Sequence, residues 1–141
     1  MKSKFLDFFL SFLRKKKKAV REPDRVATDL IQYRLDQFMT ARKPFFQPKY
    51  TIKQLSKDIK IPAYQLSAFI NQQIGMNFSD YLNRFRVKHC EELIKKANGK
   101  KMNIQQLASK CGFHNRNTFT AAFKKFTGRT PSNYAKEFGG P

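Results

Sequence analysis

The sequence predicts an all-α fold of about seven helices, organised as two homeodomain-like helix-turn-helix subdomains joined by a long linker helix. Three observations lead to this prediction. Apolar residues recur at spacings of three and four along most of the chain after residue 21. Residues with β-branched side chains are few and never alternate with polar ones, so no strand is expected. The stretches 51–81 and 103–134 repeat one pattern of apolar and glycine positions.

The first predicted helix covers residues 22–43. Its apolar residues lie at helical spacing, and Pro44 and Pro48 end it. We expect the following side chains to face the core: Ala27, Leu30, Ile31, Leu35, Phe38 and Met39.

The first helix-turn-helix is predicted over residues 44–76. Thr51 is a suitable N-cap for a helix that runs to about Ile59. Pro62 then opens a second helix, which Gly75 stops. Each of these two helices is short, so both must bury their apolar faces against each other and against neighbouring helices.

A linker helix is predicted over residues 77–97, with Asn77 as its cap and Asn98-Gly99 as the turn behind it. At about 1.5 Å per residue it would be a rod of about 31 Å. Successive major grooves on one face of DNA recur every ~34 Å. A helix of this length could therefore hold two DNA-binding units one turn of DNA apart.

The second helix-turn-helix and a terminal helix are predicted over residues 98–138. Asn103 and Asn115 cap its two main helices. Gly112 ends the first of these helices, and Gly128 ends the second. Thr130-Pro131 opens the last helix. In the repeat, the following residues of the two halves correspond: Leu55 and Leu107, Leu66 and Phe119, Ile70 and Phe123, Gly75 and Gly128, Tyr81 and Tyr134.

The charge of the chain points to a polyanionic partner. The 29 Lys and Arg residues outnumber the 10 Asp and Glu, which gives a net charge of +19. A surface of this kind favours nucleic acid or an anionic membrane face. The 15 Phe and 5 Tyr residues can fill a core, which argues against a disordered basic tail. No apolar run approaches the ~20 residues that span a bilayer, so an integral membrane protein is excluded.

Cysteine and histidine content argues against a disulfide scaffold and a metal centre. Cys90 and Cys111 lie on apolar stripes and are expected to be small core residues in a reducing, cytoplasmic setting. His89, Cys90, Cys111 and His114 do not form a convergent set of four zinc ligands. Neither a glycine-rich phosphate loop nor a paired-carboxylate motif is present, and we expect neither an enzyme nor a cofactor. No small-molecule site is identified.

Residues 1–21 form a segment of their own. Phe5 to Leu13 are mostly apolar, and Arg14 to Lys18 follow them as a cationic block. A secretory signal would have a cleavage site at that place. Two interpretations stay open: a disordered basic leader, or an anchor that inserts partway into an anionic membrane surface.

Several motifs stand together at characteristic spacings in both halves of the repeat. The second half contains Gly112-Phe113, Phe119, Phe123-Lys124-Lys125, Gly128, Thr130-Pro131 and Tyr134. The first half contains Leu55, Tyr64, Leu66-Ser67, Asn71, Gly75, Phe78, Tyr81, Asn83 and Arg86-Val87. From about Lys43 to Phe138 the chain resembles the DNA-binding region of the AraC/XylS family of bacterial transcription regulators.

That resemblance implies two helix-turn-helix units that bind promoter DNA and contact RNA polymerase, most often as an activator in the bacterial cytoplasm and nucleoid. Most members of the family carry a separate effector or dimerisation domain. About 43 residues precede the match, so we expect either a stand-alone member or the C-terminal piece of a longer regulator. In some members a membrane-spanning sensor precedes the DNA-binding region, and Phe5 to Lys18 would then be juxtamembrane.

The exposed N-terminal half of the second helix in each unit is expected to meet base edges. Arginine can bind guanine and asparagine can bind adenine, whereas alanine leaves room for a thymine methyl group or weakens specificity. The candidates are Ala63, Tyr64, Ser67, Ala68, Asn71, Arg116, Asn117, Thr120, Ala121 and Lys124. Arg86, among apolar neighbours, is instead expected to make structural ion pairs or hydrogen bonds.

Basic side chains and helix starts around these helices are expected to bind phosphates. The candidates are Thr51, Lys53, Lys57, Lys60, Lys100, Lys101, Asn103, Lys110, Asn115, Lys125 and Arg129. We therefore predict a sequence-specific, double-stranded DNA-binding transcription regulator. An RNA-binding protein of the translation apparatus and a membrane-surface interaction protein remain as alternatives.

Overall fold

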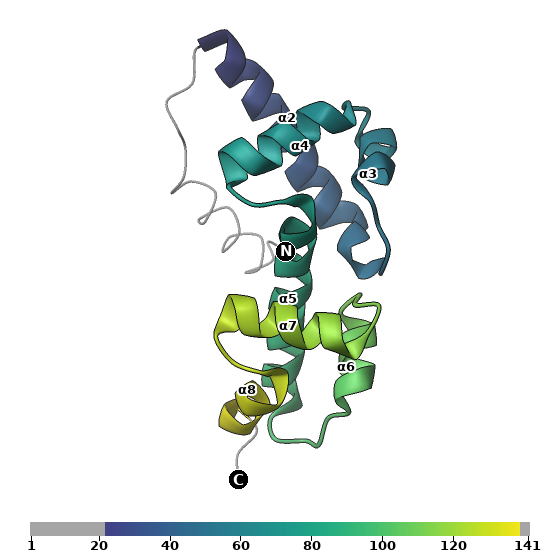
Figure 1. The fold of residues 1–141 in the computed structure, drawn as a ribbon, viewed down its shortest axis with the longest axis vertical. Coiled ribbons are helices and arrows are strands. Elements are labelled where there is room, and N and C mark those ends of the chain that lie inside the picture. Colours follow the sequence, from purple (N-terminus) through teal and green to yellow (C-terminus); the bar gives the residue numbers. More distant parts are fainter. Residues whose placement is uncertain (1–21, 139–141) are drawn as a thin grey trace. The chain divides into compact units, whose positions relative to one another are not determined.

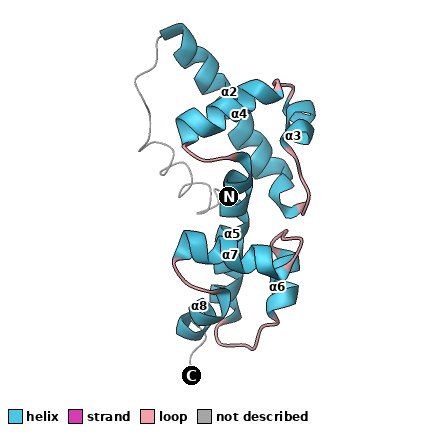
Figure 2. Cartoon of the chain, viewed as in Figure 1, coloured by secondary structure: helices cyan, strands magenta, loops and turns pink. Residues whose placement is uncertain are grey.

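A computed structural model describes residues 22–138 of the chain. Helices and loops make up all of this part, and no strand occurs within it (Figures 1 and 2). The prediction of an all-α fold of about seven helices is confirmed. The predicted membrane anchor or basic leader at residues 1–21 lies outside the described residues.

The described chain divides into two compact units. Unit 1 contains residues 22–44 and 50–81, and unit 2 contains residues 45–49 and 82–138. The sequence had placed residues 45–49 at the start of the first helix-turn-helix, but the structure groups them with the second. The physical reason is that Phe45 and Gln47 accept hydrogen bonds from Arg86 and that Phe45 lies close to Gly112. No local sequence pattern predicts these contacts.

Unit 1 consists of α2 (Glu22–Arg42), α3 (Ile52–Ile59), α4 (Ala63–Phe69), the π-helical segment η2 (Ile70–Ile74) and the first turn of α5 (Phe78–Ala97). The 3-10 turn η1 (Pro44–Phe46) follows α2. The core of this unit is apolar and closely packed, as expected for helices with one hydrophobic stripe. Its most deeply buried side chains are Leu35, Met39, Leu55, Leu66, Ile70, Ile74 and Tyr81.

The stripe of α2 is only half buried, which corrects the sequence prediction. Leu35 and Met39 are buried as expected, but Leu30 keeps 50% of its surface exposed and Ala27 is exposed as well. Helical periodicity places these residues on one side of the helix, but it does not say how far neighbouring helices extend along that side. The core of unit 1 ends before the first turns of α2 are covered.

The caps of α3 and α5 follow the local sequence. Thr51 and Gln54 form a reciprocal capping box, in which Thr51 Oγ1 accepts from the Gln54 N–H at 3.2 Å and Gln54 Oε1 accepts from the Thr51 N–H at 2.8 Å. Asn77 caps α5 by accepting from the Asp80 N–H at 2.8 Å. Gly75, at φ +81°, ends η2 in the left-handed conformation that glycine adopts without strain. These short-range contacts explain where α3 and α5 begin and where η2 ends.

One carboxyl group of unit 1 is held in an unfavourable environment. Burial raises the pKa of Asp36, on α2, from 3.8 to about 6, although a hydrogen bond from Gln32 opposes the shift. The folded chain therefore binds this proton more tightly than the unfolded chain does. The stability that Asp36 contributes is fully present below about pH 4 and is lost as the pH rises through 6.

We expect Asp36→Asn to raise the free energy of unfolding by about 1–2 kcal/mol at pH 7.5, after allowance for partial solvent screening. Below pH 4 the two chains should be equally stable, because the carboxyl is then neutral. Urea unfolding at both pH values measures the difference. Asp29→Asn, at an exposed position of the same helix, is the control and should change little. An advantage of Asp36→Asn that persists unchanged at low pH would contradict this explanation.

Unit 2 consists of residues 45–49, the remainder of α5, α6 (Ile104–Lys110), α7 (Arg116–Thr127) and α8 (Pro131–Phe138). Asn103 caps α6 by accepting from the Gln106 N–H, and Asn115 caps α7 by accepting from the Thr118 N–H. Both caps confirm the sequence prediction. The core of this unit contains Val87, Cys90, Ile94, Leu107, Ala108, Cys111, Phe113, Phe119, Ala122, Phe123 and Tyr134.

The two cysteines form a disulfide, which the sequence pattern did not predict. Cys90 on α5 and Cys111 at the end of α6 form a disulfide, with their Cα atoms 5.8 Å apart. Both are fully buried, so their assignment to the core is confirmed. The interpretation as two separate small core residues is wrong, because a separation of 21 residues along the chain does not show that the fold brings the two sulfurs together.

Arg86 occupies the interior of unit 2, where it donates to neutral oxygen atoms. Its side chain is 7% exposed and donates to the Phe45 carbonyl at 2.6 Å, the Gln47 carbonyl at 2.9 Å and Asn83 Oδ1 at 2.8 Å. Burial lowers the pKa of the guanidinium to about 10, so it stays protonated at neutral pH. Its expected structural role is confirmed, and its partners are mainly backbone carbonyls of residues 45–49.

Candidate nucleic-acid interface

The first helix-turn-helix presents one free face of α4. Leu66 and Phe69 turn inward, while Tyr64 is 72% exposed and Ala68 is also exposed. Ala63 and Ser67 are partly exposed on the same helix, as helical spacing requires. Four of the five base-edge candidates of this unit therefore lie on α4 and are accessible to a ligand.

Asn71, the fifth candidate, lies beyond α4 in the π-helical segment η2. It is exposed, and its Nδ2 lies 3.4 Å from Ser67 Oγ. A π-helical turn rotates side chains relative to an α-helix, and such turns frequently occur at functional sites. The sequence predicted one continuous helix to Ile74, so it did not predict this change of direction.

The second helix-turn-helix presents a more strongly basic face. Phe119 and Phe123 of α7 are buried, whereas Arg116, Asn117 and Lys124 are exposed. Ala121 is exposed as well, and Thr120 is partly exposed. All five base-edge candidates of this unit lie on the helix side away from its core.

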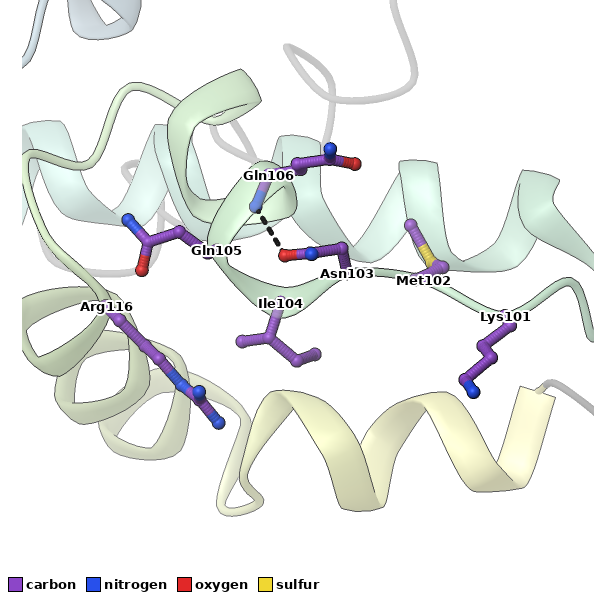
Figure 3. Close-up of a pocket in the computed structure, with 7 residues that line it drawn as sticks. All are labelled: Lys101, Met102, Asn103, Ile104, Gln105, Gln106 and Arg116. Carbon is purple, nitrogen blue, oxygen red and sulfur yellow. Dashed lines mark hydrogen bonds between the residues drawn. The ribbon is translucent and has the colours of Figure 1, made fainter.

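A pocket of about 640 Å³ lies where the start of α6 faces the start of α7 (Figure 3). It brings together Lys101, Asn103 and Arg116, which the sequence had assigned separately to phosphates and bases. Gln105 and Gln106 also line it and were not predicted, although their place in the first turn of a capped helix was a signal. Besides the apolar side chains of Met102 and Ile104, the pocket contains two cationic side chains and amide groups, which can bind a phosphate oxygen.

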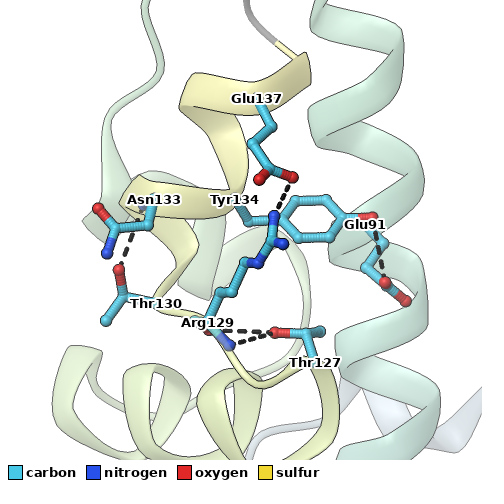
Figure 4. A network of polar contacts seen from close by, with 7 residues as sticks. All are labelled: Glu91, Thr127, Arg129, Thr130, Asn133, Tyr134 and Glu137. Atoms are coloured by element: carbon cyan, nitrogen blue, oxygen red, sulfur yellow. Dashed lines mark hydrogen bonds and ion pairs between the residues drawn. The ribbon is translucent and has the colours of Figure 1, made fainter.

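The remaining phosphate candidates are accessible, but Arg129 is already paired with a carboxylate. The exposed ones are Thr51, Lys53, Lys57, Lys60, Lys100, Lys110, Asn115 and Lys125. Arg129 is exposed but forms an ion pair with Glu137 of α8 (Figure 4). A phosphate would have to compete with this carboxylate, so Arg129 is a weaker candidate than the lysines.

A polar network holds the end of α7 and α8 in place (Figure 4). Thr127 Oγ1 donates to the Phe123 carbonyl at 2.7 Å. It also accepts from the Arg129 N–H at 3.2 Å. Tyr134 donates to Glu91 Oε1 of α5 at 3.1 Å. Burial, and then the nearby Glu91 charge, raises the pKa of the Tyr134 hydroxyl to about 12, so it remains a donor. These hydrogen bonds hold the turn between α7 and α8 and connect α8 to α5.

Known proteins share this arrangement of helices. A family model described as a helix-turn-helix domain matches residues 55–137, more than half of the chain. The chain belongs to the AraC-type helix-turn-helix family. Within its curated relatives, the chain is 29% identical over 104 residues to the HTH-type transcriptional activator RhaR of Yersinia pseudotuberculosis. That match covers 74% of this chain and 35% of RhaR, so the chain spans about a third of that relative's length.

Solved structures share the fold of this chain. A protein of unknown function from Listeria innocua is 33% identical, with a TM-score of 0.62 over 76% of this chain and 95% of that one. The C-terminal domain of AraT, a response regulator from Geobacillus stearothermophilus, is 24% identical, with a TM-score of 0.58 over 85% and 88% of the two chains. The second likeness supports the AraC-type fold alone.

Proposed function

We propose that this protein is a sequence-specific DNA-binding transcription regulator whose two helix-turn-helix units each contact a major groove of double-stranded promoter DNA. The observation that carries the proposal is that both α4 and α7 expose one face opposite a buried apolar face, and that the exposed face of α7 is basic. Residues 44–138 add an excess of positive charge, with 17 Lys and Arg against 5 Asp and Glu. This charge favours the phosphate backbone.

Activation is the mode of regulation that the relatives favour. The similar RhaR proteins are named transcriptional activators. We extend that role to this chain, with RNA polymerase as a further partner. An RNA-binding role is less well supported, because single-stranded RNA is usually recognised by exposed stacking aromatics, and Tyr64 is the exposed aromatic of the two second helices.

We place the action of this protein in the cytoplasm, because its proposed partner is promoter DNA. Within residues 22–138 no helix is long and apolar enough to cross a bilayer. Attachment of residues 1–21 to an anionic membrane surface stays a proposal, based on the apolar run from Phe5 to Leu13 and the basic block behind it.

Footprinting tests the proposal that one chain contacts two grooves. The helix α5 has 20 residues and a length of about 30 Å, close to the ~34 Å repeat of the major groove. On a duplex selected from a random pool, we expect two protected segments about 10 bp apart on one DNA face. Affinity should fall with salt along a log–log slope of roughly −5 to −9. A single protected groove, or equal affinity for all sequences, would refute the proposal.

A pair of substitutions separates base contacts from phosphate contacts. We expect Arg116→Ala to cost about 1–3 kcal/mol on the selected duplex and little on random DNA, because arginine distinguishes guanine by two hydrogen bonds. Lys125→Ala, on the same helix, should weaken binding to both duplexes about equally. Fluorescence anisotropy with both duplexes measures the difference. Equal behaviour of the two variants would instead place Arg116 on a phosphate beside Lys101.

A further inference from the structure

The disulfide of unit 2 lies directly beneath the helix proposed to contact DNA. Cys111 is the C-cap of α6 and begins the turn that leads to α7, while Cys90 lies on α5. Both are fully buried in the apolar cluster that also contains Leu107, Phe119 and Phe123. Phe119, Ala122 and Phe123 are the residues through which α7 packs on this core. The bond therefore joins α5 to the turn that sets the start of α7.

The bond is a covalent connection between α5 and the α6–α7 turn. Without it, only packing in the apolar cluster and hydrogen bonds hold the turn in place. Reduction therefore lowers the free energy needed to open this turn locally within unit 2.

The α6–α7 turn packs closely against residues 45 and 46 on one side. Gly112 follows Cys111 with φ +89°, and a Cβ placed on it would lie 2.4 Å from the Phe45 carbonyl oxygen. Because this side is closely packed, α6 and the start of α7, with Asn115 and Arg116, are the parts next to the turn that can move when it opens. Those residues include the N-cap of α7 and the predicted guanine ligand.

We propose that Cys90 and Cys111 form a redox-sensitive pair that sets the affinity of the second helix-turn-helix for DNA. The disulfide form holds α7 in the arrangement described here and binds DNA more tightly, while the dithiol form binds more weakly. The inference rests on the proposed function, because it assumes that α7 contacts DNA. The reduced chain stays folded, since nine further buried residues and the caps of α6 and α7 do not depend on the bond.

The reaction is a thiol–disulfide exchange with a low-molecular-weight disulfide such as oxidised glutathione. One cysteine thiolate attacks the small disulfide, which forms a mixed disulfide and releases one small thiol. The second cysteine thiolate then attacks the protein sulfur of the mixed disulfide and releases the second small thiol. Two electrons pass from the cysteine pair to the oxidant, and both cysteine protons leave. Because both side chains are buried, each direction requires a transient local opening of α6.

The experiment compares oxidised and reduced full-length chains on two duplexes. A duplex enriched from a randomised pool by the oxidised chain serves as the specific probe, and an unselected duplex of equal length serves as the control. Alkylation of the unfolded protein followed by mass spectrometry counts the free thiols in each sample. We expect the reduced chain to bind the selected duplex about five- to twentyfold more weakly, with little change on the control duplex. Circular dichroism should report the same helix content in both forms.

Two single variants make the result specific to this pair. Cys90→Ala and Cys111→Ala each remove the bond from a different helix, so failure of one to fold leaves the other as a test. Each should bind within about twofold of the reduced wild-type chain and no longer respond to the oxidant.

Several outcomes would overturn the inference: equal affinity of the two forms, a response that persists in either variant, or oxidation that only produces covalent dimers on a non-reducing gel. Equal, sequence-specific binding by both forms would refute the redox inference alone. Absence of duplex binding in both forms would refute the proposed function and the inference with it.

Discussion

Replacement of Arg86 by alanine is expected to lower the free energy of unfolding by about 3–5 kcal/mol. The side chain is 7% exposed and donates to the carbonyls of Phe45 and Gln47 and to Asn83 Oδ1. Its guanidinium also lies 5.7 Å from the centre of the Phe113 ring, a favourable cation–π position. Alanine would leave the acceptors of these hydrogen bonds without their donor and create a cavity.

Urea unfolding followed by circular dichroism measures the loss, and hydrogen exchange locates it. We expect residues 45–49 and α6 to lose protection before α3 does, because only the former belong to unit 2. Arg86→Lys should recover part of the stability, since an ammonium keeps the charge but cannot reproduce the planar set of donors. Lys96→Ala, at an exposed position of the same helix, is the matched control and should cost less than about 0.5 kcal/mol. A stable Arg86→Ala chain would show that these hydrogen bonds contribute little.

Gly112→Ala is expected to destabilise unit 2 by about 2–4 kcal/mol. A Cβ at this position would lie 2.4 Å from the Phe45 oxygen and 2.8 Å from the Phe46 Cα, and both of these are backbone atoms. The residue also has φ +89°, which a side chain makes unfavourable. Residues 45 and 46 would therefore have to move away from the α6–α7 turn.

Gly128→Ala is the matched control for this clash. Gly128 has a similar φ of +80°, but no atom lies within 4 Å of an added Cβ. Its substitution should cost about 1 kcal/mol, the value for the left-handed conformation alone. Thermal unfolding of both variants separates the two contributions. If both cost the same, the approach of Phe45 to Gly112 is not a constraint on the fold.

Local sequence patterns predicted the helices and their ends because the forces that set them act over a few residues. Thr51, Asn103 and Asn115 cap helices through hydrogen bonds to an N–H three positions away. Gly75 and Gly128 end helices because glycine tolerates a positive φ. The repeat between residues 51–81 and 103–134, with the family motifs within it, predicted the tandem helix-turn-helix architecture.

The exposure of the candidate residues was also predictable. Once α4 and α7 are helices with known buried faces, the opposite face must be exposed, and the candidates on both helices are exposed or partly exposed. The pocket that joins Arg116 to Lys101 and Asn103 was not predictable, because it depends on how the starts of α6 and α7 face each other. The ion pair of Arg129 with Glu137 likewise depends on the direction in which α8 leaves the turn.

The sequence by itself determined the all-α class, the caps, the two helix-turn-helix units and the basic character of the chain, because each follows from residue type and short-range spacing. Only the tertiary structure decided that residues 45–49 belong to the second unit, that Arg86 binds their carbonyls and that Cys90 meets Cys111. Arg86 and the Phe45 carbonyl are 41 residues apart along the chain. Contacts over such separations depend on how packed helices are placed, which periodicity does not specify.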